Sequence, residues 1–93
     1  MNKAGLIEAV AGELDCPKAA AERAVNAVLR SIGVGLDRDR EVALVGFGTF
    51  RVKRRGARTG INPRTGEPIH IKPSNRVTFR AGKDLLEGLR PEG

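Results

Sequence analysis

The stretch Glu41–Arg55, EVALVGFGTFRVKRR, decides the fold, because its apolar residues change from the spacing of a helix to the alternation of a strand. Val42 and Leu44 alternate before a glycine-rich bend, and Phe50 and Val52 alternate after it. The pattern predicts two short antiparallel strands joined by a tight turn. Helical patterns precede this stretch, so the sequence predicts an α+β fold.

The glycines of GFGTF, residues 46–50, raise the alternative of a phosphate-binding loop. The segment lacks the GxGxxG and GxxxxGK[ST] spacings, and it leads into a strand, whereas a nucleotide site needs a helix N-terminus. We therefore favour a strand junction with Phe47 and Phe50 on the core side.

A second pair of strand patterns follows the first. Ile69 and Ile71 alternate in PIHIK, and NRVTFR continues the return strand with Val77 and Phe79 on one side. If this strand pairs with the earlier one, the apolar face is turned towards the helices and the opposite face becomes cationic. The cations expected there are Arg51, Lys53, Arg55, Arg76 and Arg80. Like charges opposite one another destabilise a sheet, and a phosphate backbone would neutralise them.

The tip of the hairpin reads RTGINPRTG, residues 58–66. Most of its residues are turn formers, yet Ile61 and Pro63 place apolar surface between Arg58 and Arg64. Folding alone does not explain an apolar point on the most cationic part of the chain, which makes the tip a candidate contact site.

The remaining segments are predicted helices. Apolar residues at helical spacing indicate a helix at Lys3–Leu14, with Asn2 as its N-cap, and a second at Lys18–Leu36. The charged run Asp37–Glu41 is expected to be a turn, and a last short helix is expected at Lys83–Leu89.

The chain has 93 residues and only three aromatic residues, all Phe. A chain this short buries roughly 60–65% of its unfolded surface, and an extended hairpin reduces the core further. We therefore expect an obligate oligomer whose dimer core includes Phe47, Phe50 and Phe79.

Charge is concentrated in one block. Residues 51–80 hold nine Lys or Arg and one acid, while the rest of the chain holds eight bases and ten acids. Such a block indicates a polyanionic partner, with nucleic acid as the first candidate and an anionic membrane surface as the second. No apolar run has a membrane-spanning length and no signal peptide opens the sequence, so a soluble cytoplasmic protein is expected.

The sequence offers no catalytic or metal-binding constellation and implies no cofactor. His70 is the only histidine and Cys16 the only cysteine, too few for a zinc site or a catalytic set. Cys16 is expected to be structural. A solvated charged arm without a partner remains the alternative for the hairpin, although regular alternation over two strands argues against it.

GFGTF followed by RVKRRGARTGINPRTGEPI, with two helices before it and VTFRAGK and a short helix after it, resembles the bacterial HU and integration host factor family of DNA-bending proteins, and HU most. The resemblance covers the whole chain, and the RTG, NP and TG motifs of the tip are its most specific part. It implies one domain, with residues 1–50 and 76–93 forming the body and saddle of an intertwined dimer and about 51–75 forming an arm in the DNA minor groove.

The resemblance also implies roles for individual residues. Pro63 matches the family's intercalating proline, and we expect the neighbouring Ile61 to enlarge that wedge. Together with the charge pattern, it predicts a set of DNA-binding residues: Lys3, Arg51, Lys53, Arg55, Arg58, Asn62, Pro63, Arg64, Lys72, Arg76, Arg80 and Lys83.

Two positions depart from the family pattern. Ile61 stands where HU proteins often have a cation, and Asn26 stands where several relatives have an acidic partner for Lys3.

The expected function is that of a histone-like, nucleoid-associated protein that binds double-stranded DNA largely without sequence specificity, bends it and compacts the chromosome. It is expected to act as a homodimer or as a heterodimer with a paralogue, without enzymatic activity. The alternatives are a site-specific subunit like integration host factor, an RNA-binding protein, which would need exposed stacking aromatics, and a pure oligomerisation module.

Overall fold

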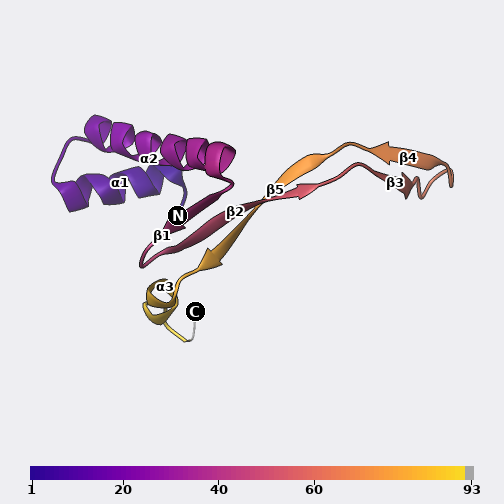
Figure 1. Ribbon diagram of the computed structural model, residues 1–93. Helices are drawn as coiled ribbons and strands as arrows, with labels where there is room; N and C mark the ends of the chain where they lie inside the picture. The colour runs from indigo at the N-terminus through magenta and orange to yellow at the C-terminus, as the bar shows by residue number, and fades with distance from the viewer. Residues whose placement is uncertain (92–93) are drawn as a thin grey trace. The chain divides into compact units, whose positions relative to one another are not determined.

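The computed structural model describes residues 1–91, and over these residues the chain forms three helices and five strands (Figure 1). One compact unit is Met1–Arg38, and the other begins at Asp39. This is the α+β fold that the sequence predicts. The elements in chain order are α1 (Lys3–Leu14), α2 (Lys18–Asp39), β1 (Glu41–Leu44), β2 (Gly48–Arg55), β3 (Arg58–Ile61), β4 (Pro68–Ile71), β5 (Ser74–Ala81) and α3 (Lys83–Glu87).

Helix α1 is capped at both ends. The Gly5 N–H donates to the side-chain Oδ1 of Asn2 at 2.9 Å, which confirms the predicted N-cap. Asp15 ends the helix in the left-handed region, with φ 50°, and its N–H donates to the carbonyl groups of Ala11 and Gly12. Local hydrogen bonds therefore set both boundaries of α1.

The helical unit has a very small core. Ile7 of α1 and Ala21 and Val25 of α2 are its buried residues, and Val10 and Cys16 are among the side chains that pack against them. Cys16 thus takes part in the packing of the helical unit, in keeping with the structural role expected for it.

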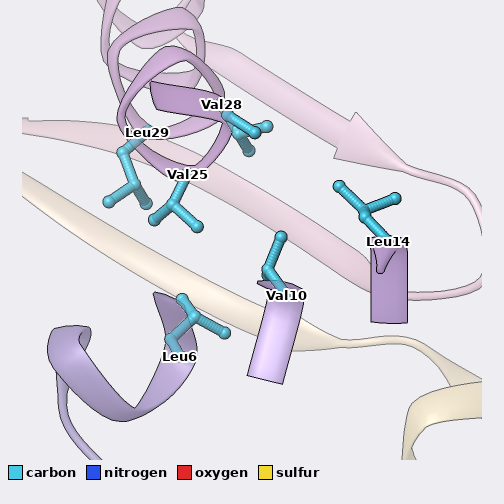
Figure 2. Close-up of a pocket in the computed structure, with 7 residues that line it drawn as sticks. Leu6, Val10, Leu14, Val25, Val28 and Leu29 are labelled. Atoms are coloured by element: carbon cyan, nitrogen blue, oxygen red, sulfur yellow. The ribbon is translucent and has the colours of Figure 1, made fainter. Parts of the chain in front are cut away.

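The two helices leave an apolar groove open between them. Side chains from α1 and α2 converge on this groove, which has a volume of ≈ 360 Å³ (Figure 2). Several of them remain about half exposed, including Leu14 at 60% and Val28 at 58%. Its lining consists of Leu6, Val10, Leu14, Ala24, Val25, Val28 and Leu29.

Helix α2 is longer than predicted. It runs through Gly33 and Gly35 to Asp39, so the expected turn at Asp37–Glu41 is wrong. Each glycine costs only about 1 kcal/mol relative to Ala, which is too little to end a helix of this length. Arg40 takes the left-handed conformation, with φ 64°, and leads directly into β1.

Strands β1, β2 and β5 form an antiparallel sheet in the order β1-β2-β5. Phe50 lies opposite Phe79, and Val52 lies opposite Val77, so these four residues share one face, as the alternation predicts. The rings of Phe47 and Phe50 lie 5.5 Å and 4.8 Å from that of Phe79. The three predicted core Phe residues therefore form one cluster.

The hairpin is interrupted once on each side. The β2–β5 pairing ends at Arg55 and Ser74, and a separate β3–β4 pairing begins at Arg58 and Ile71. The return strand is therefore two strands rather than the single continuous one predicted, and Pro73, which has no N–H to donate, lies in the break. Figure 1 shows β2 and β5 leading into β3 and β4, which end at the tip.

Helix α3 ends at Glu87 rather than at the predicted Leu89, and the N–H of Gly88 still donates to the Asp84 carbonyl at 3.2 Å. Leu86 and Leu89 remain exposed. None of the helices within residues 1–91 is long and apolar enough to cross a membrane.

Candidate nucleic-acid interface

One face of the three-stranded sheet carries the predicted cations. The β2–β5 register places Arg51 opposite Thr78, Lys53 opposite Arg76 and Arg55 opposite Ser74, while Arg80 lies opposite Thr49. Opposed residues in an antiparallel pair project from the same face. The cationic sheet face therefore consists of Arg51, Lys53, Arg55, Arg76 and Arg80.

A hollow of ≈ 470 Å³ lies on this face, lined by Thr49, Arg51, Lys53, Thr78, Phe79 and Arg80. Its polar groups are hydroxyl, ammonium and guanidinium groups, all of which donate hydrogen bonds. Such donors suit the oxygens of a phosphate group, and guanidinium groups bind them in a fork-like geometry.

An acidic side chain borders the hollow. Glu41 of the edge strand β1 lies opposite Arg51 in the β1–β2 register. Arg51 Nε donates to Glu41 Oε1 at 2.6 Å, and both side chains remain substantially exposed. Arg51 is therefore already held by a carboxylate in the free protein.

The tip of the arm is an ordered turn built around Asn62. The N–H of Asn62 donates to the Glu67 carbonyl at 2.8 Å, and its own carbonyl accepts from the Gly66 N–H at 2.7 Å. Its side-chain Oδ1 accepts from the Arg64 N–H at 2.9 Å. Gly66 has a φ of +73°, a conformation that favours glycine. The half-buried Asn62 thus organises the turn that presents Pro63 and Arg64.

Apolar surface is exposed at the tip, as the sequence suggests. Ile61 is 73% exposed and lies opposite Pro68 in the β3–β4 register, and Pro63 is also exposed. Because Ile61 is so exposed, its side chain adds little to the buried apolar surface of the arm in the free protein.

The other predicted contact residues are spread along the second unit, apart from Lys3. Arg58 begins β3, Lys72 lies between β4 and β5, and Lys83 begins α3, with its Nζ 3.8 Å from Glu87 Oε1. Lys3 begins α1 in the helical unit. The structure thus unites the sheet cations on one face and places the tip residues in one turn.

Sequence reasoning missed two contributors to this surface. Thr49 and Glu41 were not assigned to the interface, although the position of the glycine turn fixes the β1–β2 register and could have identified both. With the turn at residues 45–47, Leu44 pairs with Gly48, and the same register then places Glu41 opposite Arg51 and Ala43 opposite Thr49.

The family model described as bacterial DNA-binding protein matches residues 1–90. The chain is 51% identical over 89 residues to the DNA-binding protein HU-beta of Pseudomonas aeruginosa, covering 96% of this chain and 99% of that protein. It is 48% identical over 89 residues to the HU-alpha of the same organism, covering 96% of this chain and 99% of that protein.

A solved structure gives the same result. The chain superimposes on the HU protein of an Anabaena HU–DNA cocrystal structure with a TM-score of 0.82 and 37% identity, covering 98% of this chain and 99% of that one. The whole-length match to the family model and the shared fold lead to one assignment: the chain belongs to the bacterial DNA-binding protein family, among the HU-type proteins.

Proposed function

We propose that the protein is a histone-like, nucleoid-associated protein that binds double-stranded DNA through the cationic sheet face and the arm. The observation that carries the proposal is the β2–β5 register, which gathers five cations on one face of a two-stranded ribbon. A polyanion relieves their mutual repulsion, and phosphate groups match their donors. The HU protein of the Anabaena structure, which shares this fold, is crystallised with DNA.

Binding is largely independent of sequence in this proposal. The cations reach phosphate groups, which position a protein on DNA without carrying sequence information. Most of the cations in this proposal lie on strands and on the arm rather than on one helix that could enter the major groove. A site-specific subunit like integration host factor remains the alternative within the same family.

The arm bends the DNA in this proposal. Arg58 and Arg64 flank the apolar tip, so they hold it against the phosphate groups while Pro63 enters between base pairs from the minor groove, with Ile61 enlarging the wedge. Unstacking costs a few kcal/mol per step and is offset by the additional DNA that a bend brings onto the protein. The exposed Ile61 and the ordered turn around Asn62 support this role.

The protein acts as a dimer, either of two identical chains or with a paralogue. The core of the helical unit consists of three buried residues, and the groove between α1 and α2 remains open. The Phe cluster of the sheet is also partly uncovered, with Phe47 45% and Phe79 43% exposed. We infer that a second copy covers these apolar surfaces, with Phe47, Phe50 and Phe79 in the dimer core.

The proposed role is architectural, with no catalytic step and no cofactor. The relatives are DNA-binding proteins by name. An RNA-binding role is secondary, because stacking on bases needs exposed aromatic side chains, and the three Phe residues cluster with one another on the apolar side, where the proposed second copy covers them.

A salt-titrated binding assay on straight, nicked and prebent duplexes tests the proposal. If about eight phosphate groups are engaged, the slope of log K against log salt should be about −7. Nicked and prebent duplexes should bind more tightly than straight ones, since part of the bending cost is removed. A flat salt response contradicts the role of the cationic face.

Competition experiments separate the alternatives. Unrelated duplex sequences should compete about equally, whereas a site-specific protein prefers one. Structured RNA should compete less well than duplex DNA. A failure to bind any duplex would contradict the proposal and leave the RNA-binding protein and the oligomerisation module as the alternatives.

A further inference from the structure

The cationic sheet face contains one built-in anion. In the described three-stranded sheet, the strand residues on this face are Glu41, Ala43, Thr49, Arg51, Lys53, Arg55, Ser74, Arg76, Thr78 and Arg80. Glu41 is the only acid among them. Its carboxylate lies at the edge strand and accepts from Arg51 Nε at 2.6 Å.

We propose that Glu41 competes with DNA phosphate for Arg51 and thereby lowers the affinity and the salt dependence of DNA binding. This inference rests on the proposed function, since it concerns the same face. It adds a residue that opposes binding to a surface otherwise composed of residues that favour it.

The competition follows from the chemistry of the two acceptors. Carboxylate and phosphate oxygens both accept charge-assisted hydrogen bonds from a guanidinium group. Arg51 also lines the hollow of ≈ 470 Å³, where a phosphate group would lie beside Lys53 and Arg80. A phosphate group that binds Arg51 must therefore displace Glu41 or share the guanidinium group with it. The carboxylate also repels the phosphate group.

The exposure of the pair determines the strength of the effect. The side chain of Arg51 is 62% exposed and that of Glu41 is 47% exposed, so solvent screens their attraction. The pair is weak enough for DNA to disrupt. Glu41 therefore moderates binding and does not block it.

The pair also has a role in the free protein. Arg51 has Lys53 two residues away on the same face, and Arg80 lies diagonally across the β2–β5 ladder. One carboxylate at the border reduces the repulsion among these cations. The same contact that helps the free sheet thus opposes the bound state.

The first experiment compares the unmodified chain with Glu41→Gln in a salt-titrated assay on one duplex of random sequence. Glu41→Gln should tighten binding about two- to fivefold at low salt, from the energy of an exposed ion pair. The slope of log K against log salt should become steeper by about 0.9, because Arg51 is free to neutralise one more phosphate group. Equal or weaker binding overturns the proposal and would indicate that Glu41 orients Arg51 for DNA.

A double-mutant cycle separates competition for Arg51 from a general change in charge. The effect of Glu41→Gln is measured again in an Arg51→Gln background, where no guanidinium group remains to be released. The gain should disappear in that background. A gain of the same size in both backgrounds shows that the carboxylate acts only through long-range repulsion and overturns the proposal.

Two further variants complete the design. Glu13→Gln, in helix α1, makes the same change in net charge at a residue that is not part of the sheet and should leave affinity and slope nearly unchanged. Glu41→Thr replaces the carboxylate with a residue suited to a strand, and it is the second variant in case the amide of Glu41→Gln disturbs folding. It should show the same gain in affinity and in salt slope. Unmodified protein that does not bind DNA refutes the proposed function, whereas steep binding unaffected by Glu41 refutes only this inference.

Discussion

Lys53 and Arg76 lie directly opposite each other in the β2–β5 ladder and project from the same face of the sheet. Two like charges at such a position destabilise the free protein. If these two residues had no role besides folding, an apolar, β-branched or acidic residue at either position would make the free protein more stable. The pair is therefore a cost of folding that, under the proposed function, DNA phosphate groups offset on binding.

Replacing one member of this pair should separate stability from function. Lys53→Thr should raise the free energy of unfolding by about 0.2–1 kcal/mol, because repulsion is removed and Thr suits a strand. The same change should weaken DNA binding and make the salt slope shallower by about 0.9. Thermal unfolding and salt-titrated binding measure the two effects.

The matched control is Lys72→Thr. Lys72 lies outside both ladders, so it has no opposing cation in the register. Its replacement should affect binding but leave the stability of the free protein nearly unchanged. Equal stability changes in the two variants would show that the opposition of Lys53 and Arg76 carries no energetic cost.

Gly48 is required by a close approach in the sheet. A Cβ atom at this position would lie 2.5 Å from Phe79 Cζ and 2.6 Å from the Arg80 carbonyl oxygen. The backbone oxygen cannot move aside cheaply, so Gly48→Ala should destabilise the protein by about 1–3 kcal/mol or more. The near-ultraviolet circular dichroism of the Phe cluster and the melting temperature should both change.

Gly33→Ala is the contrasting substitution. Gly33 lies within α2, and nothing comes within 4 Å of a Cβ built there. Ala has the higher helix propensity, so the variant should gain up to about 1 kcal/mol. Destabilisation by Gly33→Ala would indicate that a second copy packs closely against this part of α2.

The sequence predicts the sheet better than it predicts the ends of the helices. Alternation in the two strands is sufficient to place Phe50 and Phe79 on the same face of the sheet, because a register shift by one residue would put every cation on the apolar face. The end of α2 depends on where one residue adopts a left-handed conformation. Arg40 does so without being Gly or Asn, and no local pattern marks it.

The candidate site was predictable to different degrees. The cations on the sheet face follow from alternation alone, and the tip residues from their motif. The break between the two ladders is marked in the sequence only by Pro73 and by Gly56 on the opposite side of the hairpin, and a continuous strand pattern extends across it. The contact between Glu41 and Arg51 depends on the register, which requires the exact position of the turn.

The apolar groove of the helical unit provides a test of the dimer. Val28 lines the groove and is 58% exposed in a single chain, so Val28→Glu places no charge in the core that one chain forms by itself. If a second copy covers the groove, a buried charge there should weaken the dimer severely. Sedimentation and the concentration dependence of the melting temperature measure the effect.

Arg23→Glu is the control for this substitution, because Arg23 lies on the same helix and is exposed but does not line the groove. It should leave the dimer intact. The unmodified chain should show no folded monomer at micromolar concentration. A stable, compact monomer would contradict the proposed dimer.

Pro63 provides the test of DNA bending. The turn is held by the hydrogen bonds of Asn62 and by Gly66, none of which involves the Pro63 ring, so Pro63→Ala should leave the dimer folded and the turn formed. The variant loses the rigid wedge, so the bend angle should fall strongly and the affinity modestly, and prebent or nicked DNA should partly restore binding. Energy transfer between dyes at the two ends of a duplex measures the bend. An unchanged bend angle would mean that Pro63 only shapes the turn, and it would contradict the proposed wedge.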